Sequence, residues 1–143
     1  MTTLVDTSVW SLALRRDAAA SEPEVQILKD YLLGDEVVVT TGLVLQELLQ
    51  RFSGPKARAQ IVHRFASLPL IQPDRDDHIG AAEVRNICRR AGVQLGTIDS
   101  LLAQLCIRHE LTLLTTDQDF VHAAKHCDCQ SGQRSHVRQD RDA

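Results

Sequence analysis

The sequence lacks any apolar run long enough to cross a membrane as a helix. It also begins without the basic and apolar regions of a secretory signal, so we expect a cytoplasmic protein with no membrane partner. Cysteine is sparse, and its spacing does not match a disulfide framework, so we expect reduced thiols at Cys88, Cys106, Cys127 and Cys129.

Aromatic residues and net positive charge are also scarce. With three Phe and one Trp, the chain offers little aromatic surface on which nucleic-acid bases could stack. The formal net charge of −3 excludes the broad basic surface of a protein that coats DNA non-specifically. It does not exclude nucleic acid, because the chain has 16 Lys and Arg and bound metal would neutralise some of its carboxylates. The length of 143 residues suits a single globular domain.

Short β-prone runs alternate with helical patterns along the chain, at residues 3–6, 37–40, 68–71 and 111–115. Such alternation predicts right-handed crossovers and a parallel sheet that helices cover on both faces. We therefore predict an α/β fold, a three-layer α/β/α domain whose parallel sheet has four strands, or five if another forms near Cys127–Cys129. Residues 1–129 are assigned to this domain. Residues 130–143 are polar and without periodicity, which predicts a disordered tail.

Four acids stand where chemistry is expected in such a fold. Asp6 and Asp117 each follow a predicted strand, and ligands of parallel sheets bind beyond the carboxyl ends of the strands. Glu47 lies among leucines on the helix after the second strand, and Asp99 lies in the first turn of the helix that begins at Thr97. If they converge, their mutual repulsion favours a hard cation such as Mg²⁺ or Mn²⁺. This pattern favours metal-assisted hydrolysis of phosphodiester bonds.

Each acid alone also has an ordinary structural explanation. Asp99 interacts favourably with the helix dipole whatever its function. Asp6 and Asp117 could serve only to begin the helices that follow them. Glu47 is the hardest to explain in this way, because apolar residues surround it in the sequence. The combination of the four acids, in this order, carries more weight than any one of them.

The acids lie in four motifs, LVDTSVW at residues 4–10, QEL at 46–48, TIDSLLA at 97–103 and LTTDQDF at 114–120. Over residues 3 to about 126 the chain thereby resembles PIN-domain ribonucleases of the VapC toxin type, from bacterial type II toxin–antitoxin pairs. The resemblance implies a PIN-like domain in which a divalent metal binds the catalytic acids, with a fifth acid beside them and hydroxyl residues supporting them. In this chain these are Asp6, Glu47, Asp99 and Asp117 as catalytic residues and metal ligands, Asp119 as the fifth acid, and Thr116 and Thr7 as supporting hydroxyls.

The resemblance further implies a cytosolic endoribonuclease that uses Mg²⁺ or Mn²⁺, acts on tRNA or rRNA, and forms a homodimer inhibited by a cognate antitoxin. Arginines that would otherwise form a solvated face become candidate contacts to RNA phosphates, namely Arg15, Arg16, Arg85 and Arg89. An amphipathic segment of the antitoxin is expected to dock on the N-terminal half, where Trp10, Leu14, Phe52 and Phe65 are concentrated.

Three alternatives remain open at this point. A non-catalytic PIN-like module that binds RNA or protein would be expected to have lost some of the acids. A phospho-acceptor signalling domain usually needs a lysine near the phosphate, and the chain has only Lys29, Lys56 and Lys125. A zinc site could use His122, His126, Cys127 and Cys129, although the spacing of the cysteines is tighter than structural zinc usually takes and no second pair exists.

Overall fold

The computed structural model describes residues 1–15, 22–126 and 130–131. Five parallel strands form one sheet in the order β3-β2-β1-β4-β5. Their bounds are β1 Thr2–Val5, β2 Val37–Thr41, β3 Leu70–Ile71, β4 Thr112–Leu114 and β5 Gln130–Ser131. The helices are α1 Thr7–Leu14, α2 Pro23–Leu33, α3 Gly42–Arg51, α4 Pro55–Phe65, α5 Arg75–Arg90, α6 Thr97–His109 and α7 Gln118–Ala123.

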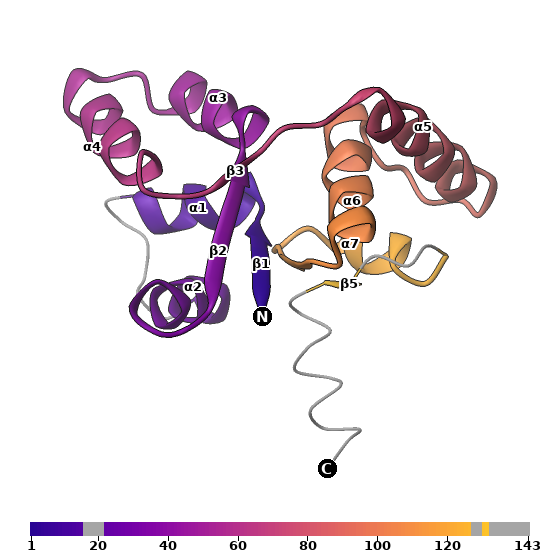
Figure 1. Cartoon of the computed structure of the whole chain (residues 1–143), viewed down its shortest axis with the longest axis horizontal. Coiled ribbons are helices and arrows are strands. Elements are labelled where there is room, and N and C mark those ends of the chain that lie inside the picture. The colour runs from indigo at the N-terminus through magenta and orange to yellow at the C-terminus, as the bar shows by residue number, and fades with distance from the viewer. Residues whose placement is uncertain (16–21, 127–129, 132–143) are drawn as a thin grey trace, which may run out of the picture.

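Figure 1 shows α1 to α4 on one side of the strands and α5 to α7 on the other. The predicted α/β fold, with a parallel sheet between two layers of helices, is therefore confirmed. Strand β1 lies at the centre and pairs with β2 and β4, so the ends of these three strands meet at one edge of the sheet. None of the described helices is long and apolar enough to span a membrane.

The fifth strand lies further along the chain than the sequence suggested. Strand β5 pairs with β4 at Gln130, the residue at which the polar tail was expected to begin. Residues 130–131 therefore belong to the sheet, while residues 132–143, where the tail was expected to continue, lie outside the described part of the chain. A two-residue edge strand is held by backbone hydrogen bonds, which leave no periodicity in the side chains, so its polar sequence gave no signal.

The core joins both helical layers to the sheet. Strands β1 and β4 are buried on both faces, as parallel strands between helices should be. On one side, Trp10 of α1 packs against Phe65 of α4, with 4.9 Å between the ring centroids. On the other side, Cys88 and Cys106 are buried and form no disulfide within the described part of the chain.

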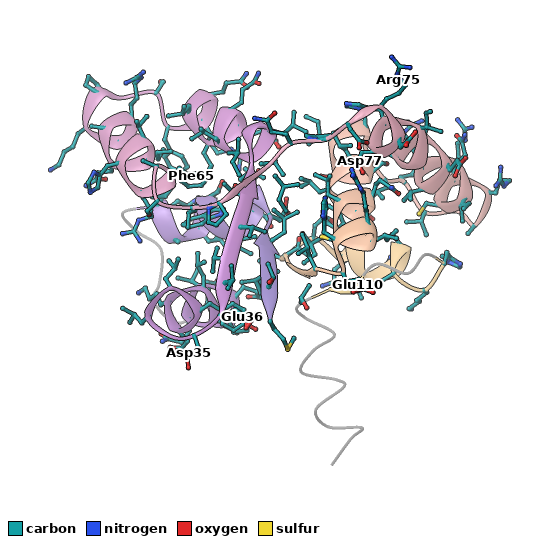
Figure 2. The ribbon with its side chains drawn as sticks, viewed as in Figure 1. Asp35, Glu36, Phe65, Arg75, Asp77 and Glu110 are labelled. Carbon is teal, nitrogen blue, oxygen red and sulfur yellow. The ribbon has the colours of Figure 1, made fainter. Side chains whose placement is uncertain are left out.

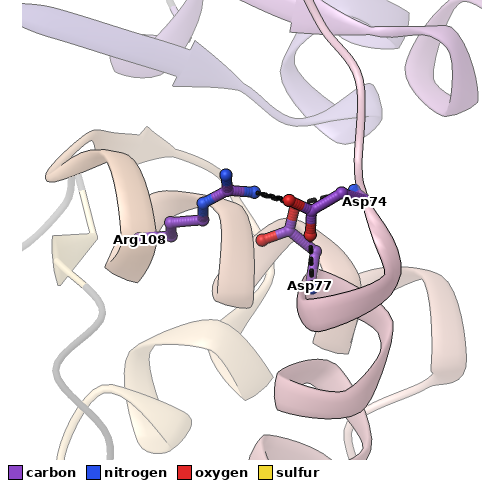
Figure 3. Close-up of polar contacts among 3 residues, drawn as sticks. All are labelled: Asp74, Asp77 and Arg108. Carbon is purple, nitrogen blue, oxygen red and sulfur yellow. Dashed lines mark hydrogen bonds and ion pairs between the residues drawn. The ribbon is translucent and has the colours of Figure 1, made fainter.

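An ionic cluster joins the start of α5 to the end of α6. Asp74 and Asp77 form a capping box at the start of α5, in which each side chain accepts a hydrogen bond from the backbone N–H of the other. The guanidinium of Arg108 bridges both carboxylates (Figure 3), with 2.9 Å from Nη1 to Asp74 Oδ2. Asp77 is 0% exposed, and its Oδ1 has no hydrogen-bond partner. Arg108 therefore supplies the positive charge that a buried carboxylate requires.

Helix ends at the site edge of the sheet follow the sequence closely. Thr41 caps α3, because its hydroxyl accepts a hydrogen bond from the Val44 N–H at 3.3 Å. Thr97 does not cap α6, since Gly96 occupies that position and Thr97 is the first helical residue. Asp99 still lies in the first turn of α6, as the acid pattern required.

Candidate functional site

Asp6 stands at the exit of the central strand. Its backbone N–H donates to the carbonyl oxygen of Leu114 at 2.9 Å, which ties it to the exit of β4. It occupies the N-cap position of α1, but its side chain makes no capping hydrogen bond. Instead, Asp6 Oδ2 accepts hydrogen bonds from Ser8 Oγ at 2.8 Å and from Thr115 Oγ1 at 2.9 Å. A helix-starting role therefore does not explain the orientation of this carboxylate.

Burial raises the pKa of Asp6 above its usual range. The hydrogen bonds from Ser8, Thr115 and the backbone of Thr7 oppose this rise in pKa, and the negative charge of Asp117 adds to it. A carboxylate in this position ionises unfavourably unless a cation comes close. The environment of Asp6 is thus the one expected of a metal ligand in the absence of its metal.

Asp99 shows that the predicted acids converge. Burial is the largest cause that raises its pKa, to about 6, and the remaining causes are the charges of other acids. These acids, in decreasing order of effect, are Asp6, Asp117, Glu47 and Asp119. Helix α6 therefore delivers Asp99 into the field of the four other predicted acids, which come from the ends of β1 and β4, from α3 and from α7. The structure brings the other four acids into electrostatic range of Asp99.

Glu47 reaches the site from α3. Its Oε1 accepts a hydrogen bond from the hydroxyl of Thr7, at 3.3 Å. Thr7 is buried at the start of α1, next to Asp6, so this bond connects the two helices that carry Asp6 and Glu47. The supporting role expected of Thr7 is consistent with this contact.

In the described residues the hydroxyl that contacts Asp6 from the end of β4 is that of Thr115, the neighbour of the predicted Thr116. Thr115 is fully buried, donates its hydroxyl to Asp6, and accepts the backbone N–H of Asp117 at 3.0 Å. Thr116 contributes only a backbone N–H, which donates to Ser8 Oγ at 3.2 Å. Adjacent threonines could not be told apart in the sequence, because β4 is buried on both faces and lacks the alternation that would mark one face. Ser8 was missed because its contact with Asp6, two residues away, gains meaning only from its further contacts with Thr115 and Thr116 at the far end of the chain.

Thr115 connects two of the acids through one hydroxyl, which leads to a prediction. Replacement by valine keeps the shape of the side chain but removes its hydrogen bonds with Asp6 and Asp117. We expect metal-dependent cleavage of RNA to fall about 10- to 100-fold, the usual consequence of losing an outer partner of a metal ligand. Thr115→Ser, which retains the hydroxyl, should keep most of the activity. Equal activity of the valine and serine variants at matched fold stability would contradict this role.

Asp117 and Asp119 lie at the start of α7. Asp117 Oδ1 accepts a hydrogen bond from the Asp119 N–H at 2.9 Å, so Asp117 does cap this helix. The structural role of Asp117 in beginning α7 therefore accounts for its Oδ1. Because Asp117 also raises the pKa values of Asp6 and Asp99, it belongs to the acidic cluster as well. Asp119 is exposed and has the weakest named effect on Asp99.

The acids fit a hard divalent cation in their chemistry. All of them are oxygen donors, and oxygen ligands are those that Mg²⁺ and Mn²⁺ prefer. The causes of the pKa shift of Asp99 include no positively charged side chain of the described residues. Within the described residues, no three His, Cys, Asp or Glu side chains stand close enough to hold an ion as they are. Neighbouring carboxylates disfavour one another's ionised form, and a cation among them would remove that cost.

The remaining predicted residues make other contacts, are exposed, or lie outside the described part of the chain. Arg15 is exposed at the end of α1, and Arg16 lies outside the described residues. Arg85 donates to the carbonyl of Leu95 at 3.1 Å, and Arg89 donates to Asn86 Oδ1 at the same distance. The alternative zinc set includes Cys127 and Cys129, which also fall outside the described residues, while His122 and His126 are exposed.

Comparison with known proteins agrees with this arrangement. Residues 3–126 match the sequence profile of the PIN domain. The chain belongs to the PIN-domain family. PIN domains are typically nucleases and are generally metal-dependent. The family resemblance found in the sequence motifs is therefore confirmed.

Solved structures of PIN-domain toxins have the same fold. VapBC-1 from nontypeable Haemophilus influenzae is 15% identical, with a TM-score of 0.70 over 92% of this chain and 96% of that one. VapC20 of Mycobacterium tuberculosis, described as a toxin that cleaves the sarcin–ricin loop, is 21% identical, with a TM-score of 0.65 over 90% and 98%. VapBC-5 of the same organism is 22% identical, with a TM-score of 0.63 over 91% and 96%. At these identities the similarity demonstrates a shared fold.

Proposed function

We propose that this PIN-domain chain is a divalent-metal-dependent endoribonuclease that acts as the toxin of a toxin–antitoxin pair. The observation that carries the proposal is the acidic cluster around Asp99, whose pKa is raised to about 6 by burial and by four other acids. A protein keeps such mutually repelling groups at a sheet edge when a function requires them. The substrate class that suits an acid cluster with a hard cation is a phosphodiester, and tRNA or rRNA is the substrate that we expect.

The side chains around the cluster have separate tasks in this proposal. Asp6, Glu47, Asp99 and Asp117 hold Mg²⁺ or Mn²⁺, with Asp119 at the rim. When bound, the metal supplies activation of water and neutralisation of charge on the phosphate oxygens. Ser8 and Thr115 hold Asp6 Oδ2 in one orientation, and Thr7 orients Glu47. Fixing ligands in this way reduces the reorganisation needed when the metal and the RNA phosphate arrive.

The test is cleavage of total RNA in a titration with Mg²⁺ and Mn²⁺. We expect discrete fragments whose yield rises with metal and disappears in excess EDTA. Undiminished cleavage in EDTA would contradict the metal-dependent mechanism. RNA binding without cleavage at any metal concentration would favour the non-catalytic module. A phospho-acceptor domain is disfavoured, since Lys29, Lys56 and Lys125 lie on α2, on α4 and after α7 instead of at the end of a strand.

A groove beside α1 and α4 is the surface that we assign to the antitoxin. Of the four residues concentrated in the N-terminal half, Trp10 and Phe65 are 2% and 5% exposed and pack against each other in the core, so these two are not available for docking. The groove next to them measures about 690 Å³ and is lined by Leu14, Gln60, His63, Arg64, Ala66 and Ser67. An inhibitory segment with apolar side chains and an acidic residue opposite Arg64 would fit this lining.

The groove yields a second prediction, which uses two alanines on or beside the same helix. Ala66→Glu places a negative charge in the groove and should weaken the complex with the co-expressed antitoxin by at least about tenfold, because the new carboxylate would repel the acidic residue expected opposite Arg64 and would compete with it for that arginine. Ala59→Glu, an exposed site of α4 outside the groove lining, is the matched control and should bind normally. Calorimetric titration measures both, and equal affinities would refute the assignment.

The expected homodimer also stays a proposal. Large apolar side chains are exposed on β3, α5 and α6, namely Leu70, Ile79, Ile87 and Ile98. Exposed apolar groups on neighbouring elements favour association. Sedimentation of the wild type and of Ile79→Lys measures the oligomeric state, and we expect the variant to dissociate. A dimer that persists unchanged in the variant would place the interface elsewhere.

A further inference from the structure

Two parallel contacts join α1 to α3 beside the acidic cluster. In the first, the hydroxyl of Thr7 donates to Glu47 Oε1 at 3.3 Å. In the second, one turn further along both helices, Arg51 Nη1 donates to Ser11 Oγ at 2.8 Å. Ser11 is 2% exposed, so the anchor of the guanidinium is fixed in the core. Arg51 is thereby held about 6 Å along the helix axis from the metal ligand Glu47, with much of its side chain exposed.

Arg51 is not neutralised within the part of the chain that the structure describes. Glu47 stands four residues before it, a spacing at which helical ion pairs often form, yet the two side chains do not form one. The ion pairs of the described residues are both made by Arg108, at the far side of the molecule. The Arg51 guanidinium uses one donor on Ser11 and keeps others available for an anion.

Positive charge continues from Arg51 into α4. Residues 48–73 contain no acid, and they carry four cations, Arg51, Lys56, Arg58 and Arg64. Since the whole chain has a net charge of −3, all other residues together carry −7. Lys56 and Arg58 are exposed in the first half of α4, and neither forms an ion pair with a described residue. In Figure 1, α3 leads from the ends of the strands toward α4, so this charge begins at the site and leads away from it.

We propose that Arg51, Lys56 and Arg58 bind the phosphate backbone of an RNA strand as it leaves the acidic site. The proposal rests on the proposed function and adds the path of the substrate. An acidic cluster repels a polyanion, so a cation fixed beside Glu47 is needed to hold the phosphate next to the one that is cleaved. The planar guanidinium of Arg51 suits a phosphate, and its anchor on Ser11 lowers the conformational entropy lost on binding.

The experiment measures RNA affinity without cleavage. Asp99→Asn supplies a chain that should bind but not cleave, and fluorescence anisotropy with a labelled single-stranded RNA gives its dissociation constant at several salt concentrations. Arg51→Gln in this background should weaken binding about three- to tenfold and reduce the salt slope by about 0.7, the value for one phosphate contact on a single strand. Lys56→Gln/Arg58→Gln should reduce the slope by about 1.4. Arg51→Lys keeps the charge and should retain the slope.

The matched control removes two exposed arginines from α5, as Arg75→Gln/Arg90→Gln. It should leave affinity and slope unchanged if the path is local, whereas equal losses in control and test variants would overturn the proposal. Normal RNA affinity of Arg51→Gln together with lost antitoxin binding would assign this surface to the protein partner and also overturn it. Failure of the wild type to cleave RNA would refute the proposed function instead, and the binding series would still decide whether RNA follows this surface.

Discussion

Asp99→Asn is expected to reduce metal-dependent RNA cleavage at least about a thousandfold, which corresponds to ~4 kcal/mol of lost transition-state stabilisation. The same variant should be more stable than the wild type when metal is absent. Both effects have one cause, because Asp99 is the carboxylate on which the charges of Asp6, Asp117, Glu47 and Asp119 act. Asparagine keeps the shape of the side chain and removes its charge, so repulsion and metal binding are lost together.

The stability effect has a defined pH window. The pKa of Asp99 is raised from 3.8 to about 6 in the folded chain, so the folded state holds this proton more tightly than the unfolded state does. Stability should therefore fall as pH rises from about 4 to about 6 and remain lower above that range. With allowance for solvent at this partly exposed group, Asp99→Asn should gain about 1 kcal/mol at pH 7 and nothing below pH 4.

Metal should reverse the order of the two proteins. Mg²⁺ or Mn²⁺ at a hundred times its dissociation constant stabilises the wild type by about 2.7 kcal/mol. The variant, having lost a ligand, should gain much less. Thermal melts of the wild type and of Asp99→Asn, with and without metal and at pH 4 and pH 7, measure these differences in stability. Asp76→Asn removes an exposed acid at the start of α5 and is the control, which should behave as the wild type in cleavage and in melting. Full activity of Asp99→Asn would refute the assignment of the site.

Arg108→Met is expected to lower the melting temperature by about 10 °C. Arg108 is the cation that pairs with the fully buried carboxylate of Asp77 (Figure 3), whose Oδ1 already lacks a hydrogen-bond partner. Removing the cation that pairs with a buried carboxylate leaves an uncompensated buried charge, which is among the most destabilising single changes in proteins. For a chain of this length such a loss shifts the melting temperature by roughly ten degrees.

The double variant Asp77→Asn/Arg108→Met isolates the cause. It leaves no charge buried, and asparagine retains an oxygen that can accept the N–H of Asp74, so the double variant should be more stable than Arg108→Met alone. Arg75→Met is the matched control, since Arg75 starts the same helix and points away from the molecule in Figure 2 while Asp77 lies toward α6. A melting temperature of Arg108→Met within about 2 °C of that of the control would mean that the ion pair contributes little.

Local patterns in the sequence determined where the acids stand. Asp6 and Asp117 follow apolar runs that form strands β1 and β4, and Asp99 lies in the first turn of a helix whose apolar stripe is strong. These assignments depend on periodicity within about ten residues, which the order of residues records directly. Because parallel strands end at one edge of their sheet, the prediction that the acids meet there followed from the same patterns.

Only the tertiary structure decided which side chains support the acids and which surfaces remain open. The hydroxyl of Thr115 reaches Asp6 across 109 positions of sequence, and that of Thr7 reaches Glu47 across 40. Trp10 is core and Arg51 is exposed beside the site, although both lie on helices whose patterns were predicted. Periodicity indicates which face of a helix is apolar, but not which distant segment covers it. Hydrogen bonds between distant segments depend on how the elements pack together, and single-sequence patterns carry no record of that packing.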